Sequence, residues 1–180
     1  MTMRLKNSSP GANRGSFETE SSVLPMALAL VFFGGCGVRA RSLGVFDNNS
    51  DIGLVEHAGS ARFNRSSNEY QIAGGGANIW GQEDAFQYLW RRDSGDFGLT
   101  AKIRWIGEGK NAHRKAGWMI RQNLTPDSPY ADAVVHGDGL ISLQFRKIKG
   151  GPTEEIKSPV SAPAFVRFER YGEVFSLCVS

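Results

Sequence analysis

Apolar and polar residues alternate in short stretches along most of the chain after residue 41. The clearest stretch is Leu-Thr-Ala-Lys-Ile-Arg-Trp at residues 99–105, where every second side chain is apolar. Successive side chains of a β-strand point to opposite faces of its sheet. This period of two therefore predicts a strand with one face in the core and the other in solvent.

Further stretches have strand character and are separated by turns rich in glycine, proline or asparagine. They are residues 61–64, 69–73, 115–122, 130–136, 140–147, 154–157, 164–170 and 174–179. Residues 85–91 fit a helix by the spacing of Ala85 and Leu89, but their three alternating aromatic residues favour a strand. Short strands at regular spacing predict an all-β fold, an antiparallel two-sheet β-sandwich or a barrel.

The N-terminal part of the chain has a different pattern. Residues 23–33 form an apolar run that is too short to span a bilayer but fits the apolar region of a signal peptide. Small residues precede Cys36, as at the site where bacteria cleave and lipidate exported proteins, although Phe33 stands where leucine is usual. Ordinary cleavage after Ala40 is the alternative, and a buried core segment is a third.

We therefore expect residues 1–40 to be a leader with a lipidation site at Cys36, and residues 41–180 to be the folded domain. The predicted location is exported, either as a periplasmic or cell-envelope lipoprotein or as a secreted protein. Contact with a membrane is expected only through the N-terminal lipid anchor.

Composition narrows the function further. The 21 basic and 18 acidic residues give a net charge of +3, which makes no electrostatic case for a nucleic-acid partner. The two cysteines, Cys36 and Cys178, are too few for a disulfide framework. Cys178 alternates with Val174 and Ser176, and we expect it to be a small core residue.

Six short motifs resemble a known domain. They are Leu-Gly-Val-Phe-Asp-Asn-Asn-Ser-Asp-Ile-Gly at residues 43–53, His-Ala-Gly-Ser at 57–60, His-Arg-Lys-Ala-Gly-Trp-Met-Ile-Arg-Gln at 113–122, Asp-Ser-Pro-Tyr-Ala-Asp at 127–132, His-Gly-Asp-Gly-Leu at 136–140 and Leu-Gln-Phe-Arg at 143–146. Together they resemble the concanavalin A-like domain that precedes a TolB-type β-propeller in some secreted proteins. They are also similar to sandwich domains attached to secreted carbohydrate-active enzymes.

The resemblance implies a concanavalin A-like jelly roll that is incomplete at its C-terminus. It also implies a β-propeller partner absent from this chain. The resemblance implies no catalytic residue in this chain, because the domain group has no agreed catalytic motif.

Carboxylates give little support for catalysis. Glucan-cleaving members of this fold carry Glu-x-Asp-x-x-Glu on one strand, and this spacing does not occur here. In the adjacent pairs at residues 83–84 and 154–155 the two side chains would face opposite ways. The weak candidate for a Ca²⁺ site is Asp47, Asn49 and Asp51, for which a polar turn is the preferred interpretation. We otherwise expect no cofactor.

Histidines and tryptophans supply the remaining candidates. The three histidines lack metal-binding spacing, and we expect His136, beside Asp138, to make a surface hydrogen bond. Trp80 and Trp90, the latter beside Arg91, are candidates for an exposed sugar-stacking platform, although burial in the core is the commoner fate of tryptophan. Core packing is expected for the tryptophans at positions 105 and 118.

The sequence thus predicts a non-catalytic module of an exported bacterial protein that binds glycan or cell-envelope polysaccharide. Its candidate binding residues are Trp80, Trp90, Arg91, His136 and Asp138. One alternative is a structural domain that docks on a TolB-type β-propeller. A second is a carbohydrate-active hydrolase whose site the motifs do not reveal.

Overall fold

The computed structural model describes residues 2–7, 43–109, 111–161 and 165–180. This part of the chain consists of strands and contains no helix, and so none that is long and apolar enough to cross a membrane. The strands are β1 (Thr2–Asn7), β2 (Asn48–Ile52), β3 (Ser60–Asn64), β4 (Glu69–Ala73), β5 (Asn78–Trp80), β6 (Glu83–Trp90), β7 (Phe97–Ile106), β8 (Lys115–Arg121), β9 (Tyr130–His136), β10 (Ile141–Arg146), β11 (Glu154–Lys157), β12 (Val166–Tyr171) and β13 (Val174–Val179).

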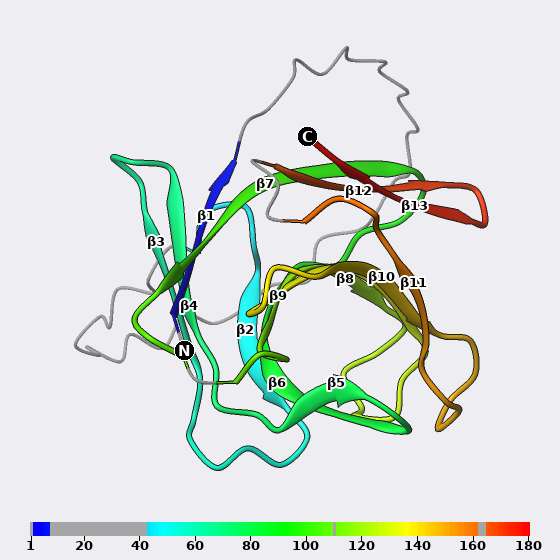
Figure 1. The fold of residues 1–180 in the computed structure, drawn as a ribbon. Coiled ribbons are helices and arrows are strands. Elements are labelled where there is room, and N and C mark those ends of the chain that lie inside the picture. The colour runs from blue at the N-terminus through cyan, green and yellow to red at the C-terminus, as the bar shows by residue number, and fades with distance from the viewer. Residues whose placement is uncertain (1, 8–42, 110, 162–164) are drawn as a thin grey trace, which may run out of the picture. The chain divides into compact units, whose positions relative to one another are not determined.

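The strands form three antiparallel sheets (Figure 1). A six-stranded sheet has the order β13-β12-β7-β1-β4-β3, a four-stranded sheet the order β11-β10-β9-β8, and a three-stranded sheet the order β2-β6-β5. The prediction of an all-β, antiparallel fold is confirmed.

Alternation located most strands to within two or three residues. The strands β4, β9, β11 and β13 have the predicted bounds, and the ambiguous residues 85–91 belong to β6. In β6 the aromatic alternation therefore outweighed the helical spacing. The predicted turn at residues 136–139 joins β9 to β10, with Gly139 at a φ of 92°.

Three strands were not predicted from the pattern of apolar and polar residues. The strand β2 is Asn-Asn-Ser-Asp-Ile, a polar sequence that we read as a turn, and it forms because β6 supplies its ladder. The strand β5 has three residues after a glycine-rich corner. The strand β1 lies within residues 1–40, the predicted leader, and pairs with β4 and β7. The apolar run at 23–33, Cys36 and Ala40 lie outside the described residues.

The main core lies between the four-stranded sheet and the strands β7, β12 and β13 of the six-stranded sheet. Ala133 and Ile141 contribute from β9 and β10, and Val166 and Phe168 contribute from β12. All four are at most 1% exposed. Two sheets therefore pack face to face through apolar side chains, as in a β-sandwich.

A second buried cluster contains Tyr70, Leu89, Ala101 and Ala116, which come from β4, β6, β7 and β8. The partly buried tryptophans at positions 105 and 118 pack against it, which agrees with their predicted core role. This cluster joins all three sheets.

The prediction for Cys178 is wrong. Its side chain is exposed, with its Sγ 3.8 Å from a carboxylate oxygen of Glu169. The alternation of Val174, Ser176 and Cys178 was correct, but the core takes the other set, Phe175, Leu177 and Val179. Periodicity gives two sets of side chains, and here the larger apolar set faces inward.

The packing predicts the stability of two variants of the β12 strand. Phe168→Ala removes a fully buried ring and should lower the free energy of unfolding by about 3–5 kcal/mol. Tyr171→Ala, at a position 75% exposed, should change it by no more than about 0.5 kcal/mol. Urea denaturation followed by circular dichroism measures both, and similar losses in the two variants would contradict this core.

Candidate functional site

The four-stranded sheet has one apolar and one polar face. The apolar face packs in the main core. The opposite face, named the polar face below, carries Lys115, Met119 and Arg121 from β8, Tyr130, Asp132, Val134 and His136 from β9, Ser142, Gln144 and Arg146 from β10, and Glu155 from β11. Five of its polar residues, Asp132, His136, Ser142, Gln144 and Arg146, are at most 3% exposed. Buried polar side chains need hydrogen-bond partners, because burial without a partner is costly.

Strand register aligns the central polar residues in one row. Asp132 of β9 lies opposite Gln144 of β10, and Gln144 lies opposite Glu155 of β11. Residues directly opposite each other in neighbouring strands project from the same face. Two strand spacings, about 10 Å, separate the backbones at Asp132 and Glu155.

Gln144 is the centre of the hydrogen bonds in this row. Its Nε2 donates to Glu155 Oε1 at 2.9 Å and to Ser142 Oγ at 3.1 Å. It also lies 3.3 Å from His136 Nε2, which is 3.3 Å from Ser142 Oγ. Because an amide nitrogen only donates, this contact makes His136 Nε2 an acceptor and assigns the proton of the neutral ring to Nδ1.

Four other buried atoms of these residues lack a partner among the described residues. They are both carboxyl oxygens of Asp132, Oε1 of Gln144 and Nδ1 of His136. A buried polar atom without a hydrogen bond costs about 1–3 kcal/mol. Hydrogen-bond donors and acceptors without partners therefore lie close together on the polar face.

Burial also sets the ionisation of these groups. It raises the pKa of Asp132 well above the usual carboxyl range, against the opposing charge of Lys115, and so favours the protonated acid. Burial and the Lys115 charge both lower the pKa of His136, which favours the neutral ring. For Glu155 burial would raise the pKa, but hydrogen bonds from Gln144 and Ser142 outweigh it and lower the pKa.

The hairpin formed by β5 and β6 crosses the polar face. At one end Lys115 Nζ donates to Asn78 Oδ1 at 3.0 Å and to the Ile79 carbonyl at 2.7 Å, and it lies 5.1 Å from the Trp80 ring centre. At the other end the Gly81 carbonyl accepts from Arg146 Nη2 at 3.0 Å. These contacts place Trp80 beside the polar face.

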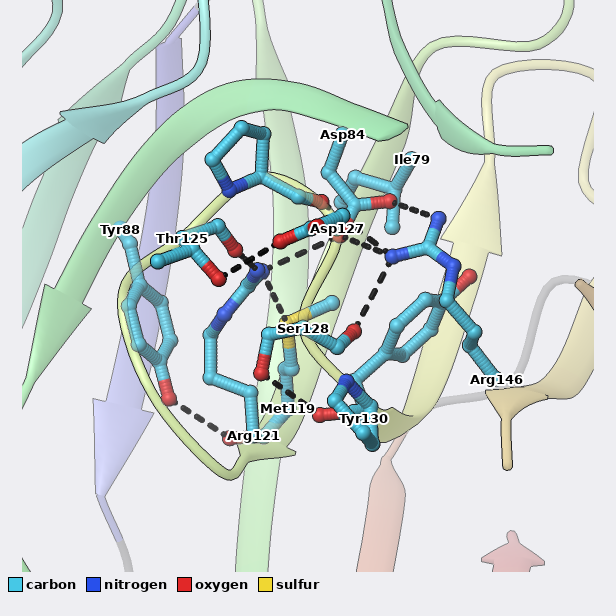
Figure 2. A network of polar contacts seen from close by, with 12 residues as sticks. Ile79, Asp84, Tyr88, Met119, Arg121, Thr125, Asp127, Ser128, Tyr130 and Arg146 are labelled. Atoms are coloured by element: carbon cyan, nitrogen blue, oxygen red, sulfur yellow. Dashed lines mark hydrogen bonds and ion pairs between the residues drawn. The ribbon is translucent and has the colours of Figure 1, made fainter. Parts of the chain in front are cut away.

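An ion pair between Asp84 and Arg146 fixes the Gly81 end (Figure 2). Arg146 donates to the two carboxylate oxygens of Asp84 at 3.0 and 2.7 Å. Its other hydrogens reach the carbonyls of Gly81, Gly151, Pro126 and Ser128. A second arginine, Arg121, donates to Asp84 Oδ2 at 3.2 Å. Every donor of Arg146 is used, so its role is structural.

The structure brings some predicted site residues to the polar face. Trp80 is 43% exposed and adjoins Lys115, which is opposite His136 in the β8–β9 register. His136 is 3% exposed, so the expectation of a surface hydrogen bond is wrong: the ring is buried, with its Nε2 3.3 Å from Ser142 Oγ. Asp138 is exposed, and its Oδ1 accepts from the Leu140 amide of the turn.

Trp90 and Arg91 lie elsewhere. Trp80 pairs with Glu83 at the start of β6, whereas Trp90 ends that strand, about 23 Å further along. The half-buried Trp90 donates its Nε1 hydrogen to Ser50 Oγ at 3.2 Å, and Arg91 pairs with Asp93. The two tryptophans therefore do not form one platform.

The three residues of the Ca²⁺ candidate each have a protein hydrogen-bond partner. Asp51 accepts from the Gly59 amide, Asp47 accepts from the Arg92 amide, and Asn49 accepts from a side-chain amide of β6. Among the described residues no three histidine, cysteine, aspartate or glutamate side chains converge as a metal site.

Sequence reasoning missed Asp132, Gln144, Glu155 and Lys115. A signal was present, because polar residues recur at every second position of β10, in an otherwise apolar stretch. Such a pattern indicates a polar sheet face, but it does not tell whether solvent or other protein covers that face.

Comparisons with known proteins return no relative. No family model, no curated protein and no solved structure matches the chain.

The ion pair predicts that two variants at neighbouring positions, one of an arginine and one of a lysine, lose very different amounts of free energy of unfolding. Arg146→Met leaves Asp84 buried with one fewer partner and should lower the free energy of unfolding by about 3–5 kcal/mol. Lys147→Met, which breaks an exposed pair with Glu154, should cost about 0–1 kcal/mol. Urea denaturation of both variants checks this, and equal values would show that the buried pair is dispensable.

The raised pKa of Asp132 predicts a pH dependence. Its contribution to stability is greatest below the ordinary carboxyl pKa of 3.8 and is lost as pH rises toward the raised folded-state pKa, because the unfolded chain releases the proton first. Asp132→Asn stays neutral and should gain in stability over the unmodified chain as pH rises from 4 to 7. Asp138→Asn, at an exposed turn, should show no such gain. Urea titrations at each pH measure the difference.

Proposed function

We propose that this protein is a non-catalytic carbohydrate-binding module with a concanavalin A-like jelly roll, and that its ligand lies on the polar face beside Trp80. As an exported protein it would meet cell-envelope polysaccharide. The observation that carries the proposal is the set of buried, unpartnered atoms on Asp132, Gln144 and His136.

The chemistry of these atoms suits a neutral sugar. A protonated Asp132 and the Nδ1–H of His136 donate, and Gln144 Oε1 accepts. Sugar hydroxyls both donate and accept, so a mixed set of neutral groups matches them better than a cluster of one charge. Binding would also satisfy atoms that are costly to leave unpaired in the unliganded protein.

Trp80 supplies the second element of sugar recognition. Its ring is 43% exposed at the edge of the polar face, where a pyranose ring could stack on it. Lys115 lies against this ring and bonds to β5. Because the row beneath is buried, a ligand that reaches Asp132 must displace the contact of Lys115 with β5.

Hydrolysis is a second candidate, favoured by one observation. Asp132 and Glu155 share a row, and their pKa values shift in opposite directions, as an acid and a base require. Their backbone separation of about 10 Å is close to the about 6.5–9.5 Å carboxyl spacing of inverting glycosidases. The complete burial of Asp132 makes binding the stronger proposal.

A glycan array followed by isothermal titration calorimetry on the full chain tests the proposal. We expect saturable binding of a neutral saccharide. Trp80→Ala should weaken it about tenfold or more by loss of stacking. Asp132→Ala should weaken it by loss of a buried hydrogen-bonding group, whereas Asp132→Asn keeps a neutral donor and acceptor there and should retain affinity while raising stability at pH 7. Trp90→Ala is the matched control, because the same residue type is removed at the far end of β6, and it should leave affinity unchanged.

Other results would decide between the candidates. Release of reducing ends that Glu155→Gln abolishes would replace the binding proposal with the hydrolase. A folded chain that binds no saccharide would favour the structural domain that docks on a β-propeller. Equal losses from Trp80→Ala and Trp90→Ala would place the ligand away from the polar face.

A further inference from the structure

Each of the three sheets ends in two strands that have an unpaired side within the described part of the chain. These edge strands are β13 and β3, β11 and β8, and β2 and β5. An unpaired edge offers its backbone N–H and C=O groups to any other strand, and proteins protect such edges with charged residues or by keeping them short. What protects each edge therefore indicates whether it is built to pair.

Five of these six edges are protected. The strands β3, β11, β8 and β2 each contain at least one charged residue, and β5 has only three residues. On β8 the Met119 carbonyl is also used, because it accepts from the Tyr88 hydroxyl at 3.2 Å. The strand β13 is different, since its six residues, Val-Phe-Ser-Leu-Cys-Val, include no charge and no proline. It lies at the end of the six-stranded sheet, beyond β12 (Figure 1).

Backbone pairing with β12 leaves three residues of β13 with free backbone groups. At the end of the β12–β13 ladder, Ser180 and Phe165 exchange both of their backbone hydrogen bonds, at 3.0 and 3.3 Å. Hydrogen-bonded and non-hydrogen-bonded pairs alternate along an antiparallel ladder, so Val179, Leu177 and Phe175 are not hydrogen-bonded to β12. Their N–H and C=O groups therefore point to the open side of the sheet.

The three residues with free backbone groups are also the three whose side chains pack in the main core. The side chains at the other three positions lie on the outer face, where Val174 is 63% exposed and Cys178 is exposed. A strand added to this edge must therefore place apolar residues directly opposite the core set. A second copy of β13 meets this requirement when it runs antiparallel with Leu177 opposite Leu177, because Phe175 then lies opposite Val179.

Two further properties favour a second copy over another strand. In this register all three free residues of each copy find a partner, whereas a shift by two residues leaves one of them unpaired and a shift by one puts core side chains opposite outer ones. Residues 174–179 carry no charge, so identical strands meet without like charges, whereas a charged partner would find no opposite charge on them.

We propose that β13 is a dimerisation edge, which pairs antiparallel with β13 of a second copy about a two-fold axis at Leu177. The two six-stranded sheets then form one continuous sheet, and the interface closes with two copies. A single strand pair is small compared with the about 1,200–2,000 Å² of stable interfaces, so the dimer should dissociate on dilution. This inference goes beyond saccharide binding and does not depend on it.

Sedimentation equilibrium of the full chain over a range of concentrations tests the dimer. We expect a reversible equilibrium between monomer and dimer. Ser176→Lys places two lysines on neighbouring strands of the dimer and should raise the dissociation constant about fivefold or more, because like charges repel and an edge lysine opposes pairing. Within one copy the lysine lies opposite Glu169 of β12, so the variant should fold.

Ser60→Lys is the matched control. Ser60 is exposed on β3, at the opposite edge of the same sheet, so the substitution adds the same charge to the other edge. It should leave the dissociation constant unchanged.

Disulfide trapping reports the register and does not depend on the lysine variants. The background is the full chain with Cys36→Ser, in which Cys178 is retained. The register places Ser176 opposite Cys178 of the second copy in a non-hydrogen-bonded pair, where Cα atoms about 4.5 Å apart lie within disulfide reach. Ser176→Cys should therefore give disulfide-linked dimers with oxidised glutathione. The control Val174→Cys should give few, because it lies two residues from the position opposite Cys178.

Three results would overturn the proposal. In the first, the unaltered chain is a monomer at every concentration, and slow hydrogen exchange of the outward amides of β13 would then assign the edge to another segment of this chain. In the second, Ser60→Lys weakens the dimer as much as Ser176→Lys, which would place the interface elsewhere. In the third, Val174→Cys is trapped as readily as Ser176→Cys, which would exclude pairing about Leu177.

Discussion

The buried ion pair between Asp84 and Arg146 is the interaction on which the arrangement of the polar face depends. It joins the start of β6 to β10, and the spare hydrogens of Arg146 bind the carbonyls of Gly81 and of the loop at residues 122–129. A charge buried in protein is tolerated only when it is paired and fully hydrogen-bonded. Only a close approach of these segments satisfies that condition, so the pair determines where the β5–β6 hairpin crosses the sheet.

The polar face therefore contains two kinds of buried polar residue. Arg146 has a partner for each of its donors and serves the fold. Asp132 has none for either oxygen among the described residues, although it lies in a neighbouring row of the same sheet. A structural role explains the first and leaves the second unexplained, because an apolar residue at 132 would avoid the cost of burial. A ligand that uses these oxygens gives the residue a reason to be polar.

The sequence by itself determined the fold class, most strand positions and the pairing of residues 136–139 in a turn, because alternation and turn chemistry are local properties. It also placed Trp80 and His136 among its candidate binding residues, and a ligand for them stays a prediction. The tertiary structure decided which of two alternating sets faces the core, as Cys178 shows, and it separated Trp90 from Trp80. It also decided that β2 and β5 form at all, since their ladders come from β6. The row of Asp132, Gln144 and Glu155 depends on register between strands, and register is a long-range property that no local pattern contains.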